Sequence, residues 1–244
     1  MSGEFQTLQL NVHKSPDIHV SLMNDESLRN FACIAVQEPS VIRKDGAVLN
    51  APMTHWNWVK LLPVVLNEEG PWLARSLLWI RADIEVEQVD VQSSDITAAV
   101  LRLPEINVLV FSVYVQPGRT NPSRTLELLE DAITKVREKE GPEVEILIMG
   151  DFNRHDYLWG GPEVSEERQG EGDGIVEFLS QYSLQSLLPT GTKTWSNSTH
   201  ASTVDLTLAS ERLATAKITC SATGNDHGSH PNLIELRTLR NACP

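Results

Sequence analysis

The chain has 244 residues, 41% hydrophobic and 22% charged, a composition typical of one large α/β domain or two small ones. Its formal net charge of −13 argues against a generally basic surface for a polyanion, although a site for divalent cations would itself be rich in carboxylates. No apolar run is long enough to span a membrane, and the first ten residues lack the basic start and apolar core of a secretory signal. We therefore expect an intracellular protein that is neither secreted nor embedded in a membrane.

The first half of the chain is predicted to consist mainly of strands. Apolar alternation predicts a strand over 5–12, Pro16-Asp17 opens a helix over about 17–30, and a nearly continuous apolar run predicts a buried strand over 32–38. Residues 39–74 are rich in proline and are predicted to be mainly loop, with one strand near 58–62. Four strand-like runs follow, of which the last three are typical of an antiparallel meander: 76–80, 84–91, 96–103 and 106–115.

The second half contains the clearest predicted helix, over 121–141. Asn121 can cap it, Pro122 suits the first helical position, and Gly141 ends it. One face of this helix is apolar, with Leu126, Leu129, Ile133 and Val136. The remaining elements are a strand over 143–150, a loop to about 172, a helix over 174–182, and strands near 203–209, 216–222 and 232–237. We predict one α/β domain over 1–244, with two stacked, mainly antiparallel sheets flanked by helices.

Polar side chains stand where several predicted strands end. Asn11 ends the first strand, Glu38 the second, Tyr114 the last of the meander, and Asp151 and Asn153 follow the strand over 143–150. Each of these alone is more often a cap, a turn residue or a sheet anchor, but their joint occurrence at strand ends indicates a functional edge. In addition, Asp205 lies inside the apolar segment "STVDLTLAS", where an ionised carboxylate requires a partner.

These residue types together suit the hydrolysis of a phosphodiester. A Glu and an Asn offer hard oxygen atoms to Mg²⁺, which takes few protein ligands, and an Asp can orient or deprotonate a water molecule. A His held by an Asp can donate to a phosphoryl oxygen, and Tyr and Asn can donate hydrogen bonds to a pentacovalent phosphorane. Such a set requires no covalent intermediate.

The chain resembles the endonuclease/exonuclease/phosphatase superfamily, whose fold is shared by DNase I and the AP endonucleases. The segments that carry the resemblance appear in the family's order: "LNV", "VQEP", "VYVQP", "GDFN", "STVDLTLAS" and "GSH". Longer segments, "GDFNRHDYLWGG" and "ERQGEGDGIVEFLSQYSLQSLLPTGTKTWS", are similar to the endonuclease domains of fungal non-LTR (LINE, Tad-like) retrotransposons. The resemblance covers almost the whole chain and implies a four-layer, DNase I-like α/β sandwich.

The resemblance implies a role for each polar residue at the predicted edge. Asn11 and Glu38 match the metal-binding pair, which would hold Mg²⁺, with Mn²⁺ as a substitute. Tyr114 matches the Tyr near the phosphate, Asp151 the residue that activates the water, and Asn153 its neighbour. Asp205 matches the carboxylate that orients the catalytic His.

Outside this set, three cations are candidate phosphate contacts, although each could equally be a solvated surface charge. They are Arg119, Arg154 and Lys193. Phe152, within the GDFN segment, is expected to pack inward.

The C-terminal motif departs from the family pattern of Ser-Asp-His, because the chain has "DHGSHPNLIEL". With one deletion in the alignment, His230 is the catalytic His and only the Asp is missing, which is the register we favour. Without a gap, Pro231 takes the place of the catalytic His and the site would be nearly inactive. Asp226-His227 is a third possible pair.

The leading hypothesis is a Mg²⁺-dependent endonuclease that nicks target double-stranded DNA and leaves a 3′-hydroxyl for target-primed reverse transcription. The resemblance then implies a monomeric domain acting in the nucleus, with a reverse transcriptase domain downstream in the full element. The alternative is a degenerate or domesticated domain of the same fold that binds nucleic acid or protein without cutting. A phosphatase for small phosphoesters would share the core site, but the retrotransposon-like segments argue against it.

Overall fold

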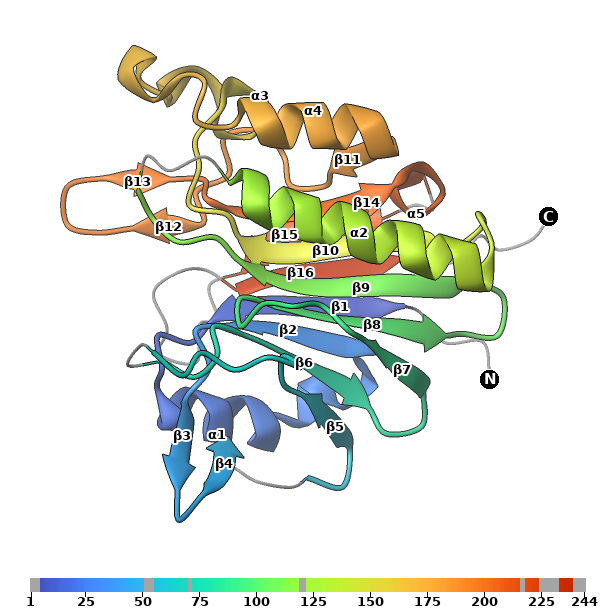
Figure 1. The fold of residues 1–244 in the computed structure, drawn as a ribbon. Coiled ribbons are helices and arrows are strands. Elements are labelled where there is room, and N and C mark those ends of the chain that lie inside the picture. The colour runs from blue at the N-terminus through green and yellow to red at the C-terminus, as the bar shows by residue number, and fades with distance from the viewer. Residues whose placement is uncertain are drawn as a thin grey trace.

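The computed structural model describes residues 5–50, 55–69, 72–118, 122–215, 218–223 and 233–238. Within them, two six-stranded sheets lie face to face, with helices on both outer faces (Figure 1). This four-layer arrangement confirms the predicted stack of two mainly antiparallel sheets, which is the DNase I-like sandwich.

The first sheet joins strands from both ends of the chain. Its order is β15-β16-β1-β2-β6-β5, and β1 and β2 are its parallel pair while the other neighbours run antiparallel. The strands are β1 (Gln6–Asn11), β2 (Cys33–Gln37), β5 (Trp58–Leu61), β6 (Ser76–Arg81), β15 (Ile218–Thr223) and β16 (Leu233–Thr238).

The second sheet has the order β11-β14-β10-β9-β8-β7, with β9 and β10 parallel. Its strands are β7 (Glu85–Val89), β8 (Ile96–Arg102), β9 (Asn107–Tyr114), β10 (Glu145–Asp151), β11 (Leu184–Ser186) and β14 (Asp205–Ser210). The pairing of β7, β8 and β9 confirms the predicted antiparallel meander.

The helices lie on the outer faces of the sheets. The long helix α2 (Ser123–Glu140) and α4 (Asp173–Tyr182) cover the second sheet, and α1 (Pro16–Asn24) covers the first (Figure 1). The apolar face predicted for α2 is buried, and Gly141 is its C-cap, whereas Pro122 occupies the N-cap position and Asn121 lies outside the described residues. The shorter helices are α3 (Tyr157–Gly160), α5 (Glu211–Thr215) and the 3₁₀ turns η1 (Glu26–Asn30), η2 (Gly161–Glu163) and η3 (Glu166–Arg168).

Several predicted boundaries require correction. The helix predicted over 17–30 ends at Asn24, because the Asp25 side chain accepts a hydrogen bond from the Ser27 amide (2.8 Å) and starts η1. The predicted loop over 39–74 contains a hairpin, β3 (Val41–Lys44) with β4 (Ala47–Asn50). A second hairpin, β12 (Trp195–Ser196) with β13 (Ala201–Ser202), projects from the left edge of the sandwich in Figure 1. These strands are too short to show a period in the sequence.

The layer between the two sheets changes from apolar to polar along its strands. On β2, the side chains that face the other sheet run from Cys33 through Ala35 to Gln37, and on β10 from Leu147 through Met149 to Asp151. At the polar end, Gln37 Nε2 donates to Ser112 Oγ on the opposite sheet (3.0 Å). Buried polar groups need such partners, so this end of the layer is held by specific hydrogen bonds rather than by apolar packing alone.

The remaining core lies under the helices. One apolar cluster packs α2 and α4 against the second sheet and includes Phe152, whose predicted inward orientation is confirmed. Another packs α1 against the first sheet and includes Trp79. None of the described helices is long and apolar enough to cross a membrane.

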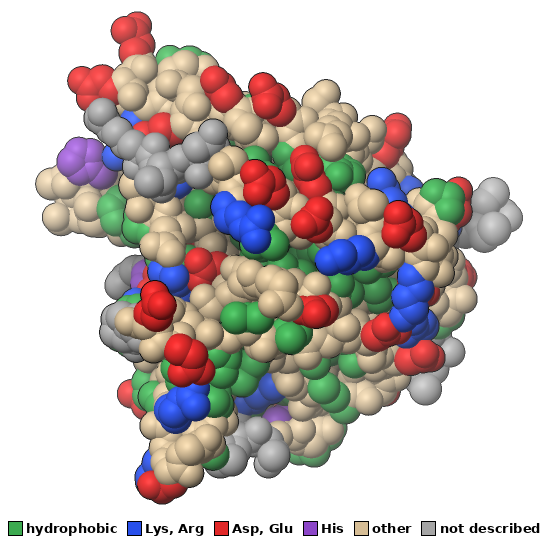
Figure 2. All heavy atoms as spheres, viewed as in Figure 1, with side chains coloured by type: hydrophobic (Ala, Val, Ile, Leu, Met, Phe, Trp, Pro, Cys, Tyr) green, Lys and Arg blue, Asp and Glu red, His purple; other side chains and the backbone are tan. Residues whose placement is uncertain are grey.

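The face that carries α2 and α4 shows acidic and basic side chains interspersed (Figure 2). This distribution agrees with the net charge of −13 and gives no extended basic stripe among the described side chains visible on that face. A partner with a phosphate backbone would therefore have to bind another face.

The buried His19 on α1 links the stability of the fold to pH. Its Nε2 accepts a hydrogen bond from the Ser40 amide (3.1 Å), and burial, together with the charge of Lys60, lowers the pKa of His19 to about 3. Because the folded state resists protonation that the unfolded chain accepts near pH 6.5, His19 stabilises the fold above that pH and loses this contribution as pH falls toward 3.

We expect His19 alone to remove about 2 kcal/mol of unfolding free energy between pH 7 and pH 5. The His19→Gln variant, which keeps an acceptor, should lose less stability over this range in urea denaturation. Any carboxyl group with a raised pKa acts in the opposite direction, but it is common to both proteins and cancels in the comparison. Parallel pH profiles for the two proteins would contradict the expectation.

Candidate active site

The strand ends that the sequence singled out meet at one edge of the sandwich. Asn11 ends β1 and Glu38 follows β2, its parallel neighbour, while Tyr114 and Asp151 are paired at the ends of the parallel strands β9 and β10. Parallel neighbours end at the same edge, and the stacking of the two sheets brings these two ends together.

The Asn11 side chain joins the two sheets at this edge. Its Nδ2 donates to Glu38 Oε1 and to Asp151 Oδ2, at 3.2 Å in each case. Its Oδ1 accepts a hydrogen bond from the His13 amide (3.0 Å). One amide therefore holds two carboxylates from different sheets close together, although like charges repel.

The pKa values of the two carboxyl groups shift in opposite directions. Burial acts to raise the pKa of Glu38, but hydrogen bonds from Lys14 and Asn11 and the charge of Lys14 bring it below its ordinary value. Burial, with the charge of Glu38, raises the pKa of Asp151 above its ordinary value despite the hydrogen bond from Asn11. Glu38 is thus the group that stays ionised, whereas Asp151 has the greater affinity for a proton.

The backbone around Asp151 is constrained. The Asn153 amide donates to Asp151 Oδ1 (3.1 Å), and Asn153 Nδ2 donates to the Val115 carbonyl (2.9 Å). Asn153 adopts a left-handed conformation (φ +50°), which Asn tolerates better than most residues. Gly150 is required for a different reason, because a Cβ there would lie 2.4 Å from the carbonyl oxygen of Val113.

Tyr114 lies beside the two carboxylates and beneath an arginine. Burial, followed by the charges of Glu38 and Asp151, raises the pKa of Tyr114, so its hydroxyl keeps its proton and can donate it. The Arg75 guanidinium lies 5.7 Å from the centre of the Tyr114 ring and is held by Asp95 through a 2.8 Å hydrogen bond from Nε. Arg75 was not identified from the sequence, since no pattern distinguishes it from a surface arginine.

Asp205 is buried opposite Asp151 in the register of β14 and β10. Burial, and then the charge of Asp151, raises the pKa of Asp205 well above its ordinary value. Its Oδ2 has no hydrogen-bond partner among the residues that the structure describes. A buried carboxylate oxygen in this state requires an explanation, and a donor that approaches it is the simplest one.

Thr194 fixes the backbone at Asp205. The buried Thr194 Oγ1 accepts hydrogen bonds from the amides of Val204 (3.0 Å) and Asp205 (3.1 Å). The Thr194 amide donates to Ser202 at the base of the β12–β13 hairpin (3.0 Å). Thr194 therefore connects that hairpin to the site. The sequence segment "TKTWS" contains no pattern that predicts this role.

The two candidate phosphate contacts that the structure describes, Arg154 and Lys193, differ in how far their side chains are exposed to solvent. Arg154 is only 2% exposed, and its Nη1 donates to the carbonyls of Gln116 (3.1 Å) and Asn153 (2.8 Å). Arg154 is therefore not a solvated surface charge, and little of its side chain is accessible to a phosphate: it braces the turn after Asp151. Lys193 is partly exposed and forms an ion pair with Glu163 (2.5 Å). Arg119, His230 and the Asp226-His227 pair lie outside the described residues.

The oxygen atoms at this edge fit a small divalent cation. When both carboxyl groups are ionised, the single Lys14 ammonium beside Glu38 does not balance their charge, and Mg²⁺ accepts few protein ligands. Glu38 is the ligand that the geometry favours, whereas Asn11 directs its nitrogen to the carboxylates and would have to turn its amide over to offer oxygen. In the described part of the chain there is no cluster of three or more His, Cys, Asp or Glu side chains that could hold a metal by themselves.

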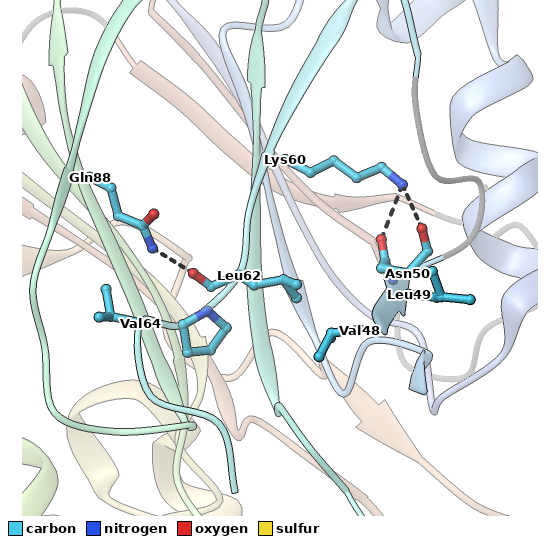
Figure 3. Close-up of a pocket in the computed structure, with 8 residues that line it drawn as sticks. Val48, Leu49, Asn50, Lys60, Leu62, Val64 and Gln88 are labelled. Atoms are coloured by element: carbon cyan, nitrogen blue, oxygen red, sulfur yellow. Dashed lines mark hydrogen bonds between the residues drawn. The ribbon is translucent and has the colours of Figure 1, made fainter. Parts of the chain in front are cut away.

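A hollow of the surface lies elsewhere and has a different lining. It lies among β4, β5 and β7, where Lys60 Nζ donates to Asn50 and Gln88 Nε2 donates to the Leu62 carbonyl (Figure 3). None of the site residues lines it. The polar residues of the strand ends therefore lie at an edge of the sandwich and not in this hollow.

One family model matches more than half of the chain. The model of a family described as "Endonuclease-reverse transcriptase" matches residues 108–234. This range contains Tyr114, Asp151, Asn153 and Asp205 but not Asn11 or Glu38. No curated protein matches the sequence.

Solved structures share the fold at low sequence identity. The endonuclease domain of TRAS1, a telomere-specific non-LTR retrotransposon, has a TM-score of 0.75 and 19% identity, covering 97% of this chain and 99% of that one. The AP endonuclease LMAP from Leishmania major has a TM-score of 0.70 and 11% identity, covering 98% and 88%. The catalytic domain of Xenopus laevis APE2 has a TM-score of 0.67 and 13% identity, covering 98% and 95%. These similarities show the DNase I-like fold.

We expect Thr194→Val to cost about 3 kcal/mol of unfolding free energy, because it leaves two buried backbone N–H groups without an acceptor. Thr194→Ser keeps the hydroxyl and should cost about 1 kcal/mol or less through the lost methyl group. Urea denaturation of the two variants gives both values. A larger loss in Thr194→Ser than in Thr194→Val would show that the methyl packing, and not the hydroxyl, holds this position.

Proposed function

Because the chain belongs to the endonuclease-reverse transcriptase family, we propose that it is a divalent-metal-dependent endonuclease that nicks one strand of double-stranded DNA. The observation that carries the proposal is the Asn11 side chain, which holds Glu38 and Asp151 together across the two sheets. Glu38 also contacts the Lys14 ammonium, whereas the hydrogen bonds to Asp151 come from the neutral amides of Asn11 and Asn153. Asp151 has a raised pKa, as is common for catalytic carboxyl groups.

The finer proposal is a nuclease of a non-LTR retrotransposon of the fungal type, which leaves a 3′-hydroxyl for target-primed reverse transcription. The segments around "GDFNRHDYLWGG" support it, as does the likeness in fold to the retrotransposon domain TRAS1. The proposal implies action on nuclear DNA and a reverse transcriptase domain encoded beyond these residues.

Each residue at the edge has a proposed task. Glu38, with Asn11, would hold Mg²⁺ or Mn²⁺, and the cation would supply positive charge to the phosphate and to the leaving oxygen. Asp151 would accept the proton of the attacking water, for which its raised pKa is suitable. Tyr114 and Asn153 would donate hydrogen bonds to the phosphate as charge develops on its oxygens.

Asp205 would orient the catalytic His, for which we propose His230. Two observations support this choice: the unpartnered Oδ2 of Asp205 and the register of β16, in which Ile234 lies opposite Gln9, two residues before Asn11. β16 thus begins at the edge where the site lies, three positions after His230. The alternative remains a non-catalytic binding domain, which the altered Ser-Asp-His motif favours.

We expect purified protein to convert supercoiled plasmid to open circles with Mg²⁺ or Mn²⁺ but not with EDTA. Glu38→Ala should lose most of this activity, at least about 100-fold, because the principal ligand is gone. Exposed Glu105→Ala, in the β8–β9 turn at the opposite end of β9 from Tyr114, is the matched control. Equal nicking by wild type and Glu38→Ala would indicate a contaminating nuclease, and no nicking by either would favour the non-catalytic domain.

We expect DNA affinity to be weak and to fall steeply with salt, given the net charge of −13. Two cations are candidate phosphate contacts. Lys193, one residue before Thr194, lies within the described part of the chain, whereas Arg119 is a candidate from the sequence alone. Lys193→Glu and Arg119→Glu should each weaken binding to all sequences alike and reduce the salt slope by about one. Fluorescence anisotropy with Lys135→Glu, which reverses an exposed charge on the outer helix α2, gives the comparison. If both substitutions leave low-salt affinity unchanged, the proposed binding face is wrong.

A further inference from the structure

The Lys14 side chain is held against Glu38 on one side and an indole ring on the other. Its Nζ lies 2.7 Å from Glu38 Oε2 and 3.9 Å from the centre of the Trp72 ring. Surface lysines usually extend their ammonium groups into water, whereas both contacts place this ammonium at the candidate metal ligand. Nothing in the resemblance or in the sequence pattern assigned Lys14 a role.

The backbone is arranged to direct Lys14 toward Glu38. His13 and Lys14 are both left-handed (φ +46° and +62°), as is Glu38 (φ +46°). The Lys14 amide donates to the Glu38 carbonyl (2.7 Å), and the His13 amide donates to Asn11 Oδ1 (3.0 Å). Left-handed conformations are costly for residues with a Cβ and persist where the surroundings impose them, often at functional sites.

Both oxygens of Glu38 have partners in this arrangement. Oε1 accepts from the neutral Asn11 amide, and Oε2 contacts the charged Lys14 ammonium. A divalent cation that binds Glu38 would be repelled by the ammonium but not by the amide. Lys14 is therefore the partner that has to leave when the metal arrives.

We propose that Lys14 is a resident counter-cation of Glu38, a positioning residue that keeps this carboxylate in place without metal and competes with the metal for it. The inference rests on the proposed function, because it requires Glu38 to be a metal ligand. Without Lys14, Glu38 and Asp151 would repel each other more strongly, and the incoming cation would meet a more negative site. Removal of the ammonium should consequently strengthen metal binding.

The test is direct titration of the full chain with Mn²⁺, followed by the electron paramagnetic resonance signal of the free ion and without DNA. Lys14→Met should bind Mn²⁺ about fivefold more tightly, as expected for removal of a partly exposed competing charge. Lys14→Arg, which keeps the charge, and Lys44→Met, which removes an exposed charge elsewhere, should match the wild type. Unchanged or weaker binding by folded Lys14→Met would overturn the proposal.

Two further measurements separate this inference from the proposed function. If Glu38→Gln binds Mn²⁺ as the wild type does, then the metal does not use Glu38 and the proposed metal site itself fails. In the wild type, the ¹⁵N-detected signal of the Lys14 ammonium should be protected from exchange without metal and lost at saturating Mg²⁺. Its persistence at saturating Mg²⁺ would overturn the proposal even if Lys14→Met did not fold.

Discussion

The hydrogen bonds from one amide group, that of Asn11, determine how the two sheets meet at the functional edge. The amide nitrogen reaches Glu38 on its own sheet and Asp151 on the other, so it spans the interface between the layers. A residue with a charged side chain could not do this equally well: a carboxylate would add a third negative charge, and an ammonium would occupy the place of a metal. The neutral amide tolerates the close approach of both carboxylates but does not neutralise their charge, which is left to Lys14 and to a bound cation.

The protonation of the carboxyl groups at this edge depends on how polar side chains are distributed in the layer between the two sheets. Away from the edge, small apolar side chains such as Cys33 and Ala35 let the sheets approach closely. Toward the edge, hydrogen-bonded pairs such as Gln37 with Ser112 and Ser76 with Thr97 replace them. Low polarity behind the site raises the pKa of Asp151 and Asp205, because burial disfavours their charged forms. Burial in the fold therefore raises the proton affinity of Asp151 and Asp205. At Glu38, the hydrogen bonds from Lys14 and Asn11 outweigh the effect of burial and keep the carboxylate ionised.

The same arrangement explains how an acidic protein can be proposed as a DNA nuclease. The acidic and basic side chains are interspersed over the face that carries α2 and α4, and Arg154 is buried as a brace for the turn after Asp151. The described cations close to the site are few, chiefly Lys14, Arg75 and Lys193, and each is engaged by a carboxylate. Binding of a polyanion would have to exchange these intramolecular partners for phosphates, which favours weak, salt-sensitive and transient contact.

The sequence by itself determined most of the strands of the two large sheets, their antiparallel meander, the long helix and the polar residues at strand ends. These features are local, because side-chain period, capping residues and turn residues lie within a few positions. It indicated Asn11, Glu38, Asp151 and Asp205 as a group, and only the family resemblance assigned them roles. What the tertiary structure decided was distance and environment. Arg154 is buried against the Gln116 carbonyl, Lys14 pairs with Glu38, and Thr194 supports the Asp205 backbone. The partners in these contacts are 11 to 38 positions apart in the chain, and the Lys14–Glu38 contact also depends on left-handed backbone conformations. No period in the sequence encodes such contacts, since they arise only when separate strand ends are stacked into one edge.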